Sequence, residues 1–190
     1  MRVEALSPGG IFAELTALSA LLEACVEGGA SIGFLWPMDE GEAEAFWRSA
    51  VRPLTDGTRV VLVARDDFGA IVGTGQLDLA TRANGRHRAE VMKMMVHPSV
   101  RKKGVGRAIM RRLEEEALAL GRTTLILDTV DGNQAAEQLY QSQGWIKIGG
   151  IPAYAVSTTG VPEKNAIYYK LLDTQSAVGE QRVDEATATG

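Results

Sequence analysis

A basic, glycine-containing loop lies near the middle of the 190-residue chain. It reads Arg-Lys-Lys-Gly-Val-Gly over positions 101–106, between an apolar segment and an amphipathic helical pattern. A helix start offers free backbone N–H groups and a partial positive charge, and both stabilise a phosphate or pyrophosphate. Gly104 and Gly106 allow the backbone to approach such an anion without an intervening side chain. The loop therefore predicts a site for a phosphorylated ligand.

Positive charge is concentrated at this loop and at the helix that follows it. Segment 101–112 carries six basic residues and no acid, whereas the whole chain has a formal net charge of −4. Without those six residues the net charge would be −10. An acidic protein with one basic loop is unsuited to general nucleic-acid binding, and it suits a small polyphosphate ligand.

Two other phosphate-binding motifs match the loop only in part. A Walker A loop requires Gly-x-x-x-x-Gly-Lys-Ser/Thr, and here Arg107 follows the second glycine. A dinucleotide-binding turn is a closer alternative, because Asp128 ends a strand about twenty residues after the glycines. That turn has a third glycine where Ile109 stands, and it has no equivalent of the segment His97–Lys103 between strand and glycines. The dinucleotide interpretation is therefore the weaker one.

Periodic apolar patterns predict the elements that position the loop. The expected helices, which repeat apolar residues at helical spacing, are Ile11–Val26, Met38–Val51 with Asp39 as N-cap and Glu42 as its capping-box partner, Val105–Leu120 and Asn133–Ser142. The expected strands, which are short and mostly β-branched or apolar, are Met1–Leu6, Thr58–Arg65, Ala70–Leu79, Arg88–Val96, Thr123–Asp128, Trp145–Ile148 and Asn165–Leu172.

Connections between these elements predict the sheet. The dipeptide Asn84-Gly85 favours a tight hairpin, so the strands within 58–96 form an antiparallel meander. A helix joins the strands 88–96 and 123–128, so those two are parallel. The link Ala30–Pro37 is apolar and is expected to pack against the core, and Gly149–Lys164 is expected to be a long loop.

Composition and cysteine content are typical of one soluble domain. Hydrophobic residues make up 45% and charged residues 23% of the chain. An apolar run of about 18 residues and a signal-peptide pattern are both missing, so neither a membrane span nor export is expected. The single cysteine, Cys25, lies in a helical apolar pattern and fits a reducing cytoplasm. We expect one domain over residues 1–172 and a polar, flexible tail over 173–190.

Two motifs together resemble the GNAT superfamily of N-acetyltransferases. Val-His-Pro at 96–98 followed by Arg-x-x-Gly-x-Gly at 101–106 is similar to its acyl-CoA-binding signature. Asn-x-x-Ala-x-x-Leu-Tyr-x-x-x-Gly-Trp at 133–145 is similar to its following helix and strand. Segments 29–34, 89–96 and 127–129 are similar to the tabtoxin-resistance acetyltransferase branch. The resemblance implies an α/β (α+β) fold with a mixed, mostly antiparallel sheet of six to seven strands, a splayed parallel pair at its centre and about four helices on both faces.

The resemblance implies acetyl-CoA as the cofactor of a single acyl-CoA N-acyltransferase domain. In that family a bulge parts the fourth strand from the fifth, and the pantetheine arm lies in the opening. Backbone groups of Met95 and Val96 would pair with the pantetheine amides as an added strand would. Asn133 matches a position that reaches this arm, with a plain helix N-cap as the equal alternative. The residues expected around the pyrophosphate are Arg101, Lys102, Lys103, Gly104, Val105, Gly106 and Arg107.

Amide formation from a thioester needs an uncharged amine, a polarised carbonyl and a proton for the leaving thiolate. Glu90 matches a family carboxylate that receives the amine proton, and its alternative is a strand residue paired with Arg88 or Lys93. Asp128 ends the neighbouring parallel strand, where it shares that role or holds a cationic amine, and its alternative is helix capping near Gly132.

A tyrosine and a backbone group complete the implied chemistry. Tyr140 matches the family tyrosine that protonates the thiolate, and its alternative is a core residue of an amphipathic helix. The N–H of Met95 is a suitable carbonyl polariser. Since Cys25 has no neighbouring support as a nucleophile, direct attack in a ternary complex is preferred. His87 and His97 stand apart, so no metal is expected.

The resemblance implies that the acceptor is bounded by the first two helices, their link and the loop before the last strand. These segments supply Ser31, Phe34, Trp36 and Tyr154. An aromatic wall with two carboxylates suits a small cationic or zwitterionic amine, such as an amino-acid-like toxin or antibiotic. A peptide N-terminus or lysine side chain is the alternative acceptor, and a non-catalytic acyl-CoA sensor is an alternative function. The apolar link and the long loop are compatible with a homodimer.

Overall fold

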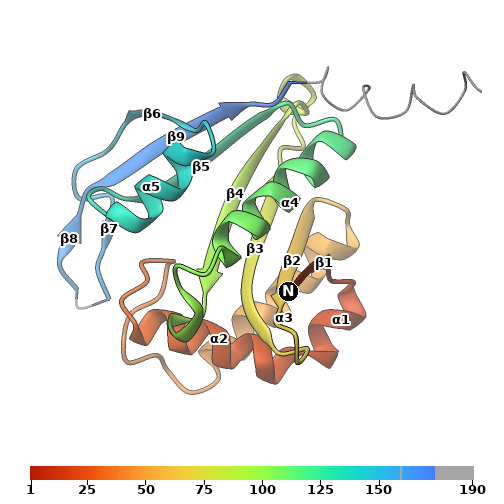
Figure 1. Ribbon diagram of the computed structural model, residues 1–190, viewed down its shortest axis with the longest axis vertical. Helices are drawn as coiled ribbons and strands as arrows, with labels where there is room; N and C mark the ends of the chain where they lie inside the picture. The colour runs from red at the N-terminus through yellow and green to blue at the C-terminus, as the bar shows by residue number, and fades with distance from the viewer. Residues whose placement is uncertain (159, 174–190) are drawn as a thin grey trace, which may run out of the picture.

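A seven-stranded mixed sheet runs through the computed structural model, which describes residues 1–158 and 160–173 (Figure 1). Its strand order is β1-β2-β3-β4-β5-β9-β6; β4 and β5 are parallel, and the other neighbouring pairs are antiparallel. The strands of this sheet are β1 Arg2–Ala5, β2 Arg59–Arg65, β3 Ile71–Leu79, β4 Arg88–Val96, β5 Thr124–Val130, β6 Ile146–Gly149 and β9 Asn165–Leu171. The expected meander and the expected parallel pair are both confirmed.

Five helices cover the two faces of the sheet. They are α1 Pro8–Ala13, α2 Leu15–Glu27, α3 Glu42–Thr55, α4 Val105–Ala119 and α5 Gln134–Ser142. Figure 1 shows α4 and α5 in front of the strands and α1, α2 and α3 at the opposite face. One apolar core lies under α4 and α5, and a second lies under α1 to α3. The expected mixed α/β fold is confirmed, with five helices in place of about four.

Alternation along the central strands explains this layering. On β2, Val61 and Val63 belong to the core under α1 to α3, whereas Leu62 and Ala64 belong to the core under α4. On β3, a Cβ at position 73 or 75 would lie 2.9 or 2.8 Å from side-chain carbons of Ile109 on α4. Glycines at these two positions therefore let α4 pack close to the sheet, and this close packing positions the first turns of the helix.

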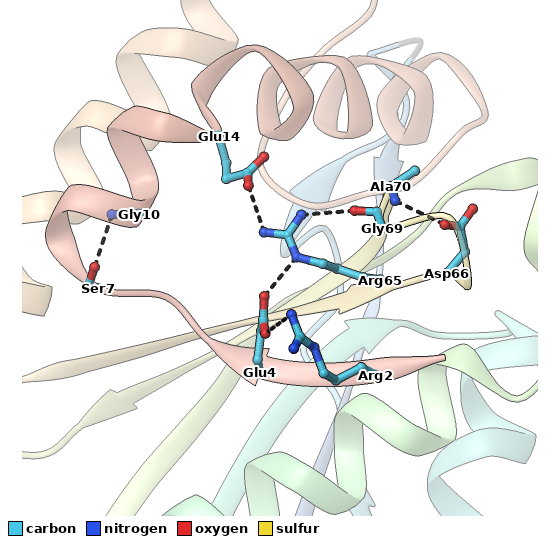
Figure 2. A network of polar contacts seen from close by, with 9 residues as sticks. All are labelled: Arg2, Glu4, Ser7, Gly10, Glu14, Arg65, Asp66, Gly69 and Ala70. Carbon is cyan, nitrogen blue, oxygen red and sulfur yellow. Dashed lines mark hydrogen bonds and ion pairs between the residues drawn. The ribbon is translucent and has the colours of Figure 1, made fainter.

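The helix expected over Ile11–Val26 is in fact two helices, α1 and α2, divided at Glu14. Ser7 caps α1 by accepting the N–H of Gly10 at 3.1 Å. The Glu14 carboxylate accepts from Arg65 Nη2 at 2.7 Å, and Arg65 Nε donates to Glu4 at 2.7 Å (Figure 2). Arg65 thus joins the bend at Glu14 to β1 and to the end of β2.

Two further expectations about local structure were wrong. The second helix begins at Glu42 after Gly41, which has φ +78° and provides no side-chain cap, and it continues beyond Val51 to Thr55. The Glu42 carboxylate accepts the N–H of Asp39 at 3.3 Å, so half of the expected capping box forms outside the helix. Asn84-Gly85 lies in a short 3-10 turn, Ala83–Gly85, because the connection from β3 to β4 is longer than a two-residue hairpin.

Two smaller corrections concern the C-terminal half. The helix expected over Val105–Leu120 ends one residue earlier, at Ala119, and Leu120 is its C-cap with 46% exposure. The loop before the last strand contains a small hairpin, β7 Ala155–Val156 with β8 Pro162–Glu163. In residues 1–158 and 160–173 we find no helix long and apolar enough to cross a bilayer. Most of the expected C-terminal tail, from residue 174 on, lies outside the described residues.

Candidate active site

A bulge in β4 separates this strand from β5. Thr74 lies opposite Met95 and Gln76 opposite Met92, so one β3 residue between them faces two residues of β4. The pairing of β4 with β5 spans Arg88 to Glu90, whereas β5 remains paired with β9 as far as Val130. The two parallel strands therefore part beyond Glu90, and polar backbone groups of β4 become available to a ligand, as an added strand requires.

The start of α4 lies directly after this opening. Gly104 is its N-cap with φ +85°, no side chain caps the helix, and its first turn contains no acid. Lys102, Lys103 and Arg107 are exposed around it. A Cβ on Gly106 would lie 3.2 Å from Leu139 of α5, so this glycine also allows close helix packing. The free N–H groups at the start of α4 and the cations around them are donors of the kind that binds the pyrophosphate of CoA.

Arg101 is placed differently from its neighbours in this loop. Its backbone N–H donates to the carbonyl of Pro98 at 3.4 Å, within the 3-10 turn Pro98–Val100. Its Nε donates to the carbonyl of Val96 at 3.4 Å. Arg101 is thus folded back onto the end of β4, and a pyrophosphate contact through its N–H would compete with the turn.

Three carboxylates lie together where β4 and β5 part. Glu90 on β4 is half-buried and lies opposite Asp78 on β3. On its other side Glu90 is paired with Ile126 of β5, and Asp128 follows Ile126 by two residues on that strand. Burial raises the pKa of the Glu90 carboxyl, and the negative charges of Asp128 and Asp78 raise it further against the opposing effect of Arg59. A carboxylate with a raised pKa, close to where two strands part, is suited to receive a proton.

The alternatives for these carboxylates find little support. Within residues 1–158 and 160–173, Glu90 forms no ion pair with Arg88 or Lys93, and Arg59 pairs with Asp78 at 2.8 Å. Asp128 accepts from the side chain of Asn165 at 3.3 Å, and the helix-capping alternative for Asp128 is wrong, because Asn133 caps α5.

Tyr140 on α5 lies within electrostatic reach of one of these carboxylates, Asp128. It is 6% exposed, and its ring lies 5.6 Å from that of Tyr168 and 6.2 Å from that of Trp145. Burial, the charge of Asp128 and Tyr168 together raise the pKa of Tyr140 to about 12. The phenol is therefore protonated at neutral pH, as a proton donor must be, and Asp128 is the group that acts electrostatically on both Glu90 and Tyr140.

The expected acceptor residues come from two segments that meet in space. We define the α2–α3 link as residues 28–41; it contributes Ser31, Phe34 and Trp36, and the β7–β8 segment contributes Tyr154. The N–H of Trp36 donates to the carbonyl of Thr158 at 3.2 Å, and Figure 1 shows the β7–β8 hairpin beside the link. Trp36 is 42% and Tyr154 53% exposed, so aromatic surface is available on both segments.

A family model described as "Acetyltransferase (GNAT) family" matches residues 17–145, which include the bulge, the loop and α5. The chain belongs to this acetyltransferase family. Its members use acetyl-CoA, and the site has the fold and donor groups to hold it.

Individual relatives are similar over different extents. An "IAA acetyltransferase" of Azospirillum brasilense is 34% identical over 93 residues, which span 49% of this chain and 58% of that protein. A ribosomal-protein-alanine N-acetyltransferase structure from Brucella melitensis has a TM-score of 0.74 and 25% identity, covering 90% of this chain and 100% of that one. A phosphinothricin acetyltransferase structure from Sinorhizobium meliloti with acetyl-CoA has a TM-score of 0.72 and 20% identity, covering 90% and 88%, and it shows the shared fold.

Asn133, Cys25 and His97 each have a structural contact within the fold. Asn133 accepts the N–H of Ala136 at 3.3 Å, so it is the N-cap of α5, and its contact with the cofactor stays a prediction. Cys25 is buried, its Sγ donates to the carbonyl of Val96 at 3.5 Å, and burial raises the pKa of its thiol. His97 caps the 3-10 turn through Ser99, and the described residues contain no cluster able to bind a metal.

Lys93 lies near the expected acceptor residues but was not predicted to be one of them. Lys93 lies in the bulge with φ +52° and donates to the carbonyl of Ile32 in the link. The sequence offers one signal for it, because Lys93 is a cation in an otherwise apolar run, Val91–Val96.

Proposed function

We propose that this acetyltransferase moves the acetyl group of acetyl-CoA to a primary amine of a small, amino-acid-like molecule, such as a toxin or antibiotic. The observation that carries the proposal is that Asp128, close to where β4 and β5 part, acts electrostatically on both Glu90 and Tyr140. A negative cluster of this kind favours a cationic amine, and its raised carboxyl pKa favours proton transfer from that amine. The similarity of segments 29–34, 89–96 and 127–129 to the tabtoxin-resistance branch supports the same class of acceptor.

Acetyl-CoA would supply an activated acetyl group as a thioester. The ends of β4 and α4 would hold it, with Met95 and Val96 facing the pantetheine arm and Lys102, Lys103, Gly104, Val105, Gly106 and Arg107 around the pyrophosphate. Glu90, with Asp128, would receive the amine proton directly or through water. Tyr140 would give a proton to the departing thiolate, and the N–H of Met95 would polarise the carbonyl.

Direct attack by the amine in a ternary complex is the mechanism that we propose. The alternative, in which Cys25 carries the acetyl group, requires a reactive thiolate. Cys25 is 1% exposed, and burial raises the pKa of its thiol, so a thiolate is disfavoured at neutral pH. We expect a Cys25→Ala variant to keep its acetyl transfer activity.

A peptide N-terminus is the second candidate acceptor, supported by the name of the Brucella melitensis neighbour at 25% identity. The contact between Trp36 and Thr158 closes one side of the acceptor region and favours a small molecule. We also propose a cytoplasmic location, because the single cysteine is buried and forms no disulfide. We further propose a homodimer, which light scattering of the purified protein tests.

The function is tested with purified protein, acetyl-CoA and a panel of small amines, amino acids and short peptides. Free thiol release and the mass of the acetylated product are measured together in each reaction. The proposal expects both signals with small amines that resemble amino acids. Preference for peptides would favour the second candidate, and tight CoA binding without thiol release across the panel would favour an acyl-CoA sensor.

A further inference from the structure

Lys93 brings a cation to the interface between the β4 bulge and the α2–α3 link. Its side chain leaves the bulge on the α1–α3 face, where Nζ donates to the carbonyl of Ile32. The same Nζ lies 5.2 Å from the ring centroid of Phe34 and 5.5 Å from that of Phe46 on α3. These two rings also contact each other, edge to face, with centroids 5.3 Å apart. Lys93 therefore joins a strand, a link and a helix through one ammonium group.

The surroundings of this ammonium are unusual for a lysine. In the part of the chain that the structure describes, Lys93 has no carboxylate at ion-pair distance, and its electrostatic neighbours are Arg59 on β2 and Asp128 on β5. Burial lowers the pKa of the Lys93 amine, Arg59 lowers it further and Asp128 opposes both. Because Lys93 is half-buried and has no such carboxylate among the described residues, the Ile32 carbonyl and the two ring faces stabilise its charge by staying close to Nζ.

Gly33 shows how closely the link approaches this group. It has φ +93°, and a Cβ at this position would lie 2.9 Å from Lys93 Nζ. The residues on either side, Ile32 and Phe34, both contact Lys93 or its surroundings. The positive φ favours glycine at this position, where the link crosses the ammonium.

The link has few other polar contacts to hold its shape. Residues 28–41 contain no helix or strand, and outside its own helical ends the link bonds to Thr158 through Trp36. Lys93 thus supplies the contact at the sheet end of the link, and Thr158 supplies the contact at its outer end. Phe34 lies between these two points and Trp36 makes the outer contact itself; both are aromatic residues expected to face the acceptor.

We propose that Lys93 is a positioning residue that holds the α2–α3 link in its acceptor-binding shape. The proposal rests on the proposed acetyl transfer to a small amine, because it assigns the link to that acceptor. One bulge would then serve two purposes, since its backbone opens β4 for acetyl-CoA and its side chain fixes the opposite wall. In this proposal Lys93 acts through the link, by its contacts with Ile32 and Phe34.

The chain contains a probe for the shape of the link. Trp36 is 42% exposed, whereas Trp47 and Trp145 are 0% and 3% exposed, so collisional quenching of tryptophan by acrylamide reports mainly on Trp36. The variants are Lys93→Met, which keeps the length but removes the charge, and Lys93→Arg, which keeps the charge. Arg111→Met on the exposed surface of α4 is the matched loss of a cation. Trp36→Phe in each background isolates the Trp36 signal.

In Lys93→Met we expect the Trp36 quenching constant to rise by about twofold, because the link loses its contact with the bulge. The KM for the best amine of the panel should rise by about tenfold, while the KM for acetyl-CoA stays within about twofold. Lys93→Arg should recover part of both effects, and Arg111→Met should show neither.

Unchanged quenching in a folded Lys93→Met protein would overturn the proposal, as would an equal rise of both KM values. If Lys93→Met does not fold, Phe34→Leu removes one ring face from the ammonium and leaves the bulge intact. A rise in Trp36 quenching in Phe34→Leu then supports the proposal, and no rise overturns it. Quenching needs no acceptor, so a failed amine panel would count against the proposed function and leave this test decisive for Lys93.

Discussion

The cofactor half and the acceptor half of the site are assembled in different ways. The cofactor half, around β4 and α4, comes from the continuous segment 91–107 and offers mainly backbone groups. The acceptor half joins segments far apart in sequence: Lys93 contacts Ile32, 61 positions away, and Trp36 contacts Thr158. Backbone groups depend little on side-chain identity, whereas a loop surface changes with every substitution. We therefore expect the first half to define the cofactor and the second to define the acceptor.

The largest effect should come from the carboxylates that lie between the two halves. In a Glu90→Gln/Asp128→Asn double variant we expect kcat to fall by about 100- to 10,000-fold, because no group remains to receive the amine proton. The KM for acetyl-CoA should be unchanged, since the proposed mechanism assigns both residues to the acceptor. Steady-state kinetics with the best amine measure this, and wild-type turnover in the double variant would remove the proposed base.

A charge variant of the cofactor half should separate it from the acceptor half. Replacing Lys102, Lys103 and Arg107 by Met is expected to raise the KM for acetyl-CoA by about 100-fold, because three exposed cations leave the helix start. The KM for the amine should stay the same. Arg111→Met/Arg112→Met removes two cations farther along α4 and serves as the control; a similar rise there would mean that net charge alone is responsible.

Tyr140→Phe should have a more moderate effect. We expect kcat to fall by about tenfold, because the thiolate would leave without a positioned proton donor. Both KM values should hold, since the ring contacts with Tyr168 and Trp145 remain. A change confined to KM would instead assign Tyr140 to packing.

The smallest expected effect is on the stability of the folded state, which the raised pKa of Glu90 makes dependent on pH. A carboxyl whose pKa is raised above its ordinary value on folding stabilises the folded state below that value, and this stability is lost as the pH rises through the folded pKa. Glu90→Gln should therefore have a higher Tm than wild type at pH 8, and the difference should vanish near pH 4. The same raised pKa predicts an acid limb in the wild-type kcat/KM profile, with activity rising as Glu90 loses its proton. Calorimetry and pH profiles check both statements, and a lower Tm of the variant at pH 8 would contradict the first.

The sequence predicts the cofactor half well because its signals are local. Strand periodicity, two glycines and helical periodicity lie next to one another between Val91 and Ala119, and each has the expected structure. The break at Glu14 was not predicted, because apolar residues continue at helical spacing through it and its contact with Arg65 joins residues 51 positions apart. Lys93 could not be assigned for a similar reason, since its aromatic partners come from the link and α3. The β7–β8 hairpin was missed because two-residue strands have too little pattern to recognise.

The most direct test of the division between the two halves is a matrix of KM values. Wild type, the Lys102/Lys103/Arg107 triple variant, Trp36→Ala and their combination are compared with acetyl-CoA and with the best amine. We expect the triple variant to raise only the KM for acetyl-CoA, Trp36→Ala to raise only the KM for the amine, and the two effects to be additive in free energy. If either change raised both KM values, or if the combination departed from additivity, the two halves would not be separate and the account would be wrong.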